Sequence, residues 1–435
     1  MIRTTHVWIL SLIAIVLSAL SMWQRTVAVE PQHDEIALLL PPDAIEFNEV
    51  EKIILNRSDE KLVFERIDGH WLQTHPFVCN MDTSSLMTLI ERALGLLQLG
   101  VVEGEVSKEI LGLGQNANSL IIATTDERVT ISLGRMTLGG RAYASVNDGQ
   151  PVTVSQSLHR LAIDTDHRYW RDIRLFPDVS IDSQRIERRI DDDVLRLDRS
   201  SGNWMIQEPV SARVHDAALV DWIGHIASAK LNSFVVDEPK DLALFSLLSP
   251  RASLSITDRD GETTTILIGG RVSAGSQNRY VKLKNTPMVF SMNWDSLSQL
   301  FPSTEIIAAP TGSGVSPFDV KRIRIATQDN ETILRRELDS WVDETRGNKI
   351  IDEEQVRALL SWLLEAHPVS VAIGPYPRNL QVATITFEGY DRIPMDAVRI
   401  AKQEDGSWIL DNGENVLRLH PADAGEVLLR FAEIN

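Results

Sequence analysis

The chain has 435 residues, 43% of them hydrophobic and 24% charged, which is enough for about three globular domains of ordinary composition. Its formal net charge of −18 argues against a nucleic-acid partner, because an acidic protein repels phosphates instead of neutralising them. The single cysteine, Cys79, excludes an internal disulfide, and we interpret it as a small, half-buried apolar residue.

A membrane segment is predicted near the N-terminus. An uncharged stretch runs from Val7 to Trp23, between Arg3 and Arg25. Its length is at the short end for a transmembrane helix, and a tryptophan near each end suits the membrane–water interface. We therefore expect residues 1–25 to anchor the protein in a membrane, with the bulk of the chain outside the cytoplasm. A cleaved signal peptide and a buried soluble helix are the alternatives.

An internal repeat follows a juxtamembrane linker over residues 26–49. Trp71, Trp204 and Trp341 are separated by 133 and 137 residues, and each precedes a segment with apolar residues at helical spacing. The same offsets align the apolar residues of the three segments, which form one face of each predicted helix: Leu86, Leu89, Ile90 and Ala93; Leu219, Trp222, Ile223 and Ile226; Val356, Leu359, Leu360 and Leu363. Three helices with one shared buried face are therefore predicted.

Each of the first two repeats is predicted to begin with a β-hairpin and a strand that starts near the tryptophan. Pro76 and Pro209 end that strand, since proline cannot donate to the sheet, and a helix follows. The helix of the first repeat has an N-cap in Asp82. Alternating strands after the helix predict an antiparallel meander, so each repeat is interpreted as an α+β unit.

The third repeat follows a linker rich in proline and glycine over residues 302–317. It keeps Trp341 and the helix around Asp352–Glu365, but it has Arg346 in place of the proline and lacks the Leu-Gly element of the others. We interpret it as degenerate, because terminal repeats are often atypical. The predicted domains are residues 50–178, 179–301 and 318–435.

Two segments resemble a P-loop and one resembles a serine-hydrolase elbow, but each lacks a residue that its motif requires. A P-loop holds phosphates with a glycine loop followed by Lys and Ser or Thr, and neither Gly134–Gly140 nor Gly269–Gly275 has that lysine. Both segments are interpreted as hairpin turns. A serine-hydrolase elbow needs a glycine two residues before its serine, and Arg271 stands there before Ser273.

Metal-ligating and acid–base residues do not form a recognisable site either. His70, His75 and Cys79 have a loosely metal-like spacing, but a separation of five puts the two histidines on opposite faces of a strand. Two acid–base candidates on the second helix, Asp221 and His225, are interpreted as part of a solvated face, together with His215 and Asp216. Two acidic clusters without the full calcium-loop pattern are interpreted as turns: Asp191–Asp193 and Asp258–Glu262.

The repeated motifs resemble a bacterial family, domain of unknown function 4340. They comprise Asp68-Gly69-His70-Trp71, Pro76, Leu111-Gly112-Leu113, Leu133-Gly134, Tyr280-Val281 and a closing segment Trp170–Leu175. The resemblance covers most of residues 50–300 and part of 315–435. It implies a single N-terminal span in the bacterial inner membrane, and a gene often near gliding-motility-type ABC transporters. It implies no catalytic residues.

From these observations we expect a non-enzymatic, extracytoplasmic protein that mediates protein–protein interaction, as an accessory to an ABC transport system. No catalytic, cofactor-binding or metal-binding residue is assigned, and no cofactor is expected. The three tryptophans are interpreted as core residues that pack each helix on its sheet, although regularly spaced aromatic residues also suit a glycan-binding surface. An envelope hydrolase or glycan-binding module is therefore the alternative, and a purely structural spacer is a third possibility.

Overall fold

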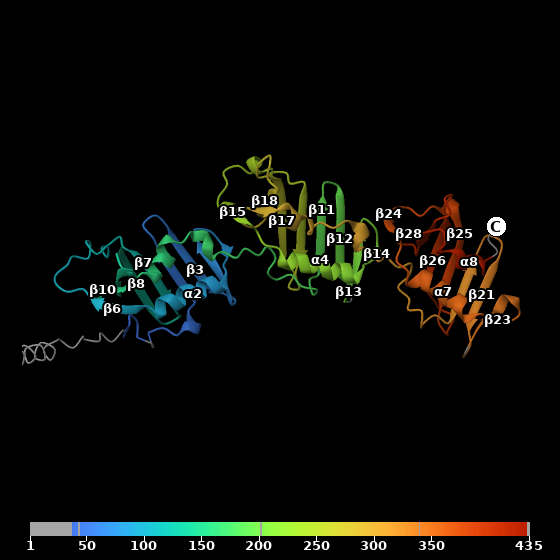
Figure 1. Ribbon diagram of the computed structural model, residues 1–435, viewed down its shortest axis with the longest axis horizontal. Helices are drawn as coiled ribbons and strands as arrows, with labels where there is room; N and C mark the ends of the chain where they lie inside the picture. The colour runs from blue at the N-terminus through green and yellow to red at the C-terminus, as the bar shows by residue number, and fades with distance from the viewer. Residues whose placement is uncertain (1–36, 42–43, 201, 339, 433–435) are drawn as a thin grey trace, which may run out of the picture. The chain divides into compact units, whose positions relative to one another are not determined.

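The computed structural model describes residues 37–41, 44–200, 202–338 and 340–432 (Figure 1). The chain divides into two compact units, residues 1–172 and 173–435. The membrane-spanning helix predicted over Val7–Trp23 lies outside the described residues. Within them, no helix has the length and apolar character that crossing a membrane requires.

The first unit contains one antiparallel sheet of ten strands in the order β1-β6-β10-β9-β8-β7-β2-β3-β4-β5. Its elements are β1 (Ala37–Leu38), η1 (Phe47–Glu49), β2 (Lys52–Asn56), β3 (Lys61–Ile67), β4 (His70–His75), β5 (Cys79–Asn80), α2 (Thr83–Leu94), β6 (Leu97–Val101), β7 (Asn118–Ala123), β8 (Arg128–Thr137), β9 (Arg141–Val146), β10 (Val152–Ser155), α3 (Ser157–His159), η2 (Arg160–Asp164) and η3 (His167–Trp170).

The second unit begins with a nine-stranded antiparallel sheet in the order β14-β13-β12-β11-β16-β17-β18-β19-β15. Its elements are β11 (Arg185–Ile190), β12 (Asp193–Ser200), β13 (Asn203–Glu208), β14 (Ala212–Arg213), α4 (Asp216–Ser228), β15 (Ser233–Val236), η4 (Leu242–Phe245), β16 (Ala252–Thr257), β17 (Thr263–Arg271), β18 (Asn278–Leu283), β19 (Val289–Asn293), α5 (Trp294–Ser298) and α6 (Thr304–Ile307).

A second nine-stranded sheet in this unit has the order β23-β22-β21-β20-β25-β26-β27-β28-β24. Its elements are β20 (Arg322–Ala326), β21 (Glu331–Arg336), β22 (Trp341–Asp343), η5 (Glu344–Arg346), β23 (Lys349–Ile351), α7 (Glu353–Leu364), β24 (Ser370–Ile373), η6 (Arg378–Leu380), β25 (Gln381–Glu388), β26 (Pro394–Lys402), β27 (Trp408–Asp411), β28 (Val416–His420) and α8 (Glu426–Leu429).

The predicted α+β class is wrong, because the protein consists mostly of antiparallel β-sheet. In each repeat the hairpin before the helix and the meander after it join into one sheet. Ile53 of β2 pairs with Ile122 of β7, Ile186 of β11 with Ile256 of β16, and the same connection joins β20 to β25. One helix of 12 or 13 residues then covers each sheet, as α2, α4 and α7 do in Figure 1.

The interpretation of the third repeat as degenerate is also wrong. Its strand order matches that of the second repeat strand for strand. The missing Leu-Gly element has a steric explanation. A Cβ on Gly269 of β17 would lie 2.2 Å from Phe245 O, whereas in the third repeat the residue after Ile400 is Ala401, which packs with Tyr376. The glycine therefore makes room for a crossing loop, and the sheet forms without it.

The predicted core is confirmed. Trp71, Trp204 and Trp341 are 2%, 8% and 4% exposed, and all the apolar residues predicted on the three helix faces are buried. The strands β4 and β13 end immediately before Pro76 and Pro209, both of which follow cis peptide bonds. The division of the chain into three domains, with the boundaries given above, stays a prediction.

Candidate functional site

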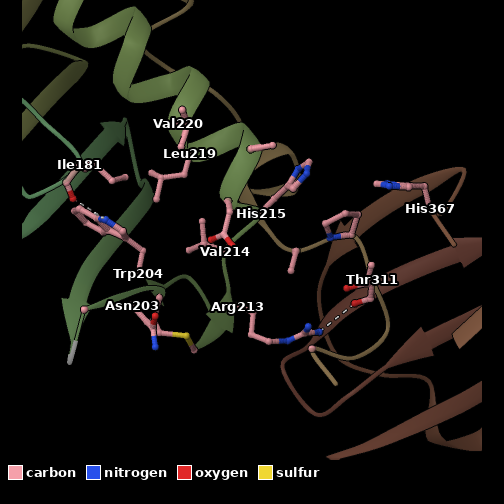
Figure 2. A pocket seen from close by; sticks show the side chains of 17 residues that line it. Ile181, Asn203, Trp204, Arg213, Val214, His215, Leu219, Val220, Thr311 and His367 are labelled. Atoms are coloured by element: carbon pink, nitrogen blue, oxygen red, sulfur yellow. Dashed lines mark hydrogen bonds between the residues drawn. The ribbon is translucent and has the colours of Figure 1, made fainter. Parts of the chain in front are cut away.

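A cleft with a volume of about 830 Å³ opens within the second unit, beside Trp204 and the first turns of α4 (Figure 2). One wall comes from the sheet and helix of the second repeat. The other comes from the linker that leads to the third sheet, Ala309–Thr311, and from His367, which lies between α7 and β24. The cleft therefore exists only because the second repeat and the segments that follow it pack together.

Apolar side chains form the wall that the second repeat contributes. Trp204 and Val214 are each 8% exposed, Leu219 is buried, and Val220 on the next turn of α4 is 57% exposed. Trp204 is held in place by its indole Nε1, which donates to Ile181 O at 3.3 Å. The wall thus combines a fixed aromatic edge with an aliphatic side chain that is free to contact a ligand.

Two histidines face each other across the cleft. The ring centroids of His215 and His367 are 6.5 Å apart, and the rings are inclined by 58°. In Figure 2 the two imidazoles point toward one another from the start of α4 and from the third-repeat side. They give the cleft polar groups beside its apolar wall, as do Asn203, Arg213 and Asp216.

His215 stands at the N-cap of α4, where the other two long helices have aspartate. Asp82 accepts from Ser84 N and Asp352 accepts from Glu354 N, both at 3.1 Å, whereas His215 makes no side-chain cap hydrogen bond. Side-chain capping supplies an acceptor to backbone N–H groups that have no partner inside the helix. The start of α4 therefore lacks an interaction that its two counterparts have.

The far end of the cleft is fixed by a network of charged side chains. Glu414 Oε1 accepts from Arg213 Nε and from Arg213 N, each at 3.1 Å, and Arg213 Nη2 donates to Thr311 O at 3.0 Å. Arg418, whose side chain is fully buried, donates to Glu414 Oε2 at 3.1 Å and to Ala309 O at 2.9 Å. Burial raises the pKa of Glu414, but the two guanidinium groups outweigh it and hold this pKa below its usual range.

A smaller cavity of about 340 Å³ occupies the equivalent place in the third repeat. It is lined by Phe318, Trp341, Arg336 and Leu360, among others. Phe318 and Trp341 are 137 residues after Ile181 and Trp204, which line the larger cleft. Two of the three repeated tryptophans are therefore core residues that also line a cavity.

The residues considered as catalytic or metal-binding candidates lie apart from this cleft, except His215 and Asp216. His70 and His75 are at the two ends of β4 and exposed, and buried Cys79 has its Sγ 3.9 Å from the sulfur of Met81. The described residues include no group of three or more His, Cys, Asp or Glu side chains placed to hold a metal ion. Asp221 and His225 lie on the exposed face of α4, as predicted.

The motifs interpreted as turns lie in or directly beside the turns of hairpins. Asp258 Oδ1 accepts from Asp260 N and Glu262 N, both at 2.9 Å, in the connection between β16 and β17. Asp191 and Asp192 connect β11 to β12, while Asp193 begins β12 and pairs with Arg188. The glycine segments and Ser273 belong to the hairpins β8–β9 and β17–β18.

Sequence reasoning missed Arg213, His367, Glu414 and Arg418. The pairing of Arg213 with Glu414 joins residues 201 positions apart, so no local pattern indicates it. One signal was available for Arg418. It alternates with Leu417 and Leu419 along β28 and shares a face with buried Val416, so a charge is predicted to point into the protein.

Comparison with known proteins identifies one family. A search of curated proteins finds no match. The family described as Domain of unknown function (DUF4340) matches residues 204–379, which include α4, the linker and His367. The matched range contains Tyr280-Val281 but not the motifs of the first repeat. Over residues 204–379, the range that includes most of the cleft, the chain resembles the DUF4340 family, as its motifs predicted.

Proposed function

We propose that this protein is a non-enzymatic, membrane-anchored component of the bacterial cell envelope that binds a segment of a partner protein in the cleft beside Trp204. The observation that carries the proposal is the composition of this cleft. It brings the side chains of Trp204 and Val220 together with those of His215 and His367 in one cleft. Binding hot spots combine such apolar anchors with a few polar groups that fix orientation.

The rigidity of the cleft supports the same proposal. Arg213, Glu414 and Arg418 connect the second repeat to the third by hydrogen bonds, and they do so at the end of the cleft. A binding surface that is already ordered loses less conformational entropy when a ligand binds. A protein segment would therefore meet a preformed groove.

The cellular setting in this proposal rests on the sequence. The uncharged segment Val7–Trp23 would anchor the protein in the inner membrane, with the cleft outside the cytoplasm. The family resemblance supports a subunit of an ABC transport system as the partner. These two parts are independent of the cleft geometry.

The test compares two variants at native expression level. After crosslinking in membranes and solubilisation, the wild-type protein should co-purify with transporter subunits. Val220→Arg should lose them, because a charge then occupies the apolar wall. Leu244→Arg is the matched control, since Leu244 is 77% exposed on η4 and does not line the cleft. Recovery of the wild-type protein alone, or equal recovery by Val220→Arg, would contradict the proposal.

A glycan-binding module is the second candidate, because Trp204 and Trp341 each line a cavity. Sugar rings usually stack on the exposed face of an aromatic side chain, and these indoles are only 8% and 4% exposed. We therefore favour the protein partner. Quenching of tryptophan fluorescence by soluble peptidoglycan fragments, abolished in Trp204→Leu but not in Trp71→Leu, would reverse this preference.

A further inference from the structure

The outer edges of the three sheets differ in how they are covered. In the first unit, Asp82 N donates to Trp170 O at 2.7 Å and Asp172 N donates to Asn80 O at 3.0 Å. The segment that follows the first sheet thus continues it beyond β5, where Met81 and Arg171 form an antiparallel bridge. These contacts lie within the first unit.

The second repeat covers its edge in the same way. His215 N donates to Ile307 O at 2.8 Å, Ala309 N donates to Arg213 O at 2.9 Å, and Val214 bridges Ala308. The residues that come next, Pro310 and Thr311, then line the cleft beside Trp204. One extended segment therefore pairs with the edge and also forms a wall of the cavity.

The third repeat has the same edge in β23. Ile350 and Asp352 are 137 residues after Arg213 and His215, and Ile350 pairs with Val342 in the register in which Arg213 pairs with Met205. Within residues 340–432, no other segment forms a backbone hydrogen bond with the outer side of β23. An open strand edge is a template for pairing with another chain.

The side chains around this edge are unusually apolar for a surface. Ile350 is 72% exposed and Phe318 is 79% exposed. Ile351 is the cross-strand partner of Trp341, whose indole lines the cavity of about 340 Å³ with Leu360 and Phe318. The open edge and the cavity are thus one strand apart, as they are in the second repeat.

The cavity is also lined by charged side chains. Arg336 lies against the cavity, and the residues that the structure describes supply no acidic group within ion-pair distance of it. Nearby Arg335, by comparison, pairs with Glu337 and Glu344. Glu353, Arg357 and Glu365 line the same cavity, so charged side chains of both signs lie beside its apolar residues.

We propose that the edge of β23 and the cavity beside Trp341 bind an extended, apolar segment of a partner protein, which adds to the third sheet as a further strand. The segment has the chemistry of the one that covers β14: two branched apolar residues followed by two small residues, as in Ile306–Ala309. This surface is separate from the cleft beside Trp204, and either one can fail without the other.

The test uses the full chain and a fluorescent synthetic peptide with the sequence of residues 303–311. The peptide should bind, and on binding it should slow amide hydrogen exchange at Asp352, the counterpart of His215, at least fivefold. Ile350→Asp should weaken binding at least tenfold, whereas Leu244→Asp, at a site of similar exposure, should not change it. Val220→Arg should leave it unchanged, which separates this surface from the cleft.

A second probe keeps the result independent of any effect of Ile350→Asp on folding. The same peptide, N-methylated at the position of Ala309, has lost the N–H that donates to Arg213 O in the second repeat, and it should bind at least tenfold more weakly. Three results would overturn the proposal: equal binding of both peptides, a dimer of the chain that Ile350→Asp abolishes, or peptide binding that appears only when the chain is shortened to end at Ala432.

Discussion

Glu414 accepts two hydrogen bonds from Arg213, one from the guanidinium Nε and one from the backbone N–H, and both are 3.1 Å long. Arg213 lies in β14 of one sheet, and Glu414 lies in the connection between β27 and β28 of the other. The opposite oxygen of Glu414 accepts from Arg418, whose side chain is fully buried. One carboxylate therefore neutralises two cations at the junction of the second and third repeats.

Replacing Glu414 should destabilise the second unit strongly. In Glu414→Gln, Arg418 would keep a buried charge without the carboxylate to which it donates, and such losses cost about 3 kcal/mol of unfolding free energy. Urea denaturation followed by tryptophan fluorescence measures this change. Glu353→Gln is the control, because Glu353 pairs with Arg357 on the exposed face of α7 and should cost less than about 0.5 kcal/mol. Equal effects of the two substitutions would show that the junction does not depend on Glu414.

Low pH should lower the unfolding free energy of the third repeat because of His420. Burial and the nearby Arg418 lower the pKa of His420 to about 4, from an ordinary value of 6.5. The unfolded chain therefore binds a proton between pH 6.5 and about 4 that the folded protein does not bind. This contribution to stability is complete above pH 6.5 and is lost as the pH falls toward 4, on the order of 2 kcal/mol.

His420→Gln should remove that part of the pH dependence. Unfolding free energies at pH 7 and pH 4.5 should differ less in the variant than in the wild type, even if the variant is less stable at both. His225→Gln serves as the control, since His225 is exposed on α4. A wild-type pH dependence that survives unchanged in His420→Gln would assign it to other groups.

The N-cap of α4 predicts a stabilising substitution. His215→Asp restores the residue type of Asp82 and Asp352, whose side chains accept hydrogen bonds from the first turn of their helices. The gain should be about 1 kcal/mol, seen as a rise in Tm. His225→Asp adds the same charge at the last turn of α4, where the helix dipole disfavours it, so no gain is expected. Similar gains from both substitutions would rule out capping as the cause.

The sequence predicted local structure better than connections between distant segments. Apolar residues at helical spacing identified the buried faces of all three helices, because that periodicity is a property of each segment alone. The α+β class was wrong because the pairing of Ile53 with Ile122 joins a hairpin to a meander across an intervening helix. The cleft could not be predicted for the same reason, since Arg213 and Glu414 are 201 residues apart.

The last prediction concerns Gly269, whose counterpart in the third repeat is Ala401. Gly269→Ala places a methyl group 2.2 Å from Phe245 O and 3.0 Å from Leu247 Cγ, so the crossing loop or β17 must shift. Overpacking of this kind costs about 1–3 kcal/mol of unfolding free energy, which thermal denaturation measures. Gly275→Ala is the matched control in the following hairpin, because a Cβ there would have no neighbour within 4 Å. If Gly269→Ala is as stable as Gly275→Ala, the loop relaxes easily, and a crossing loop does not explain why the first two repeats carry Gly134 and Gly269 where the third has Ala401.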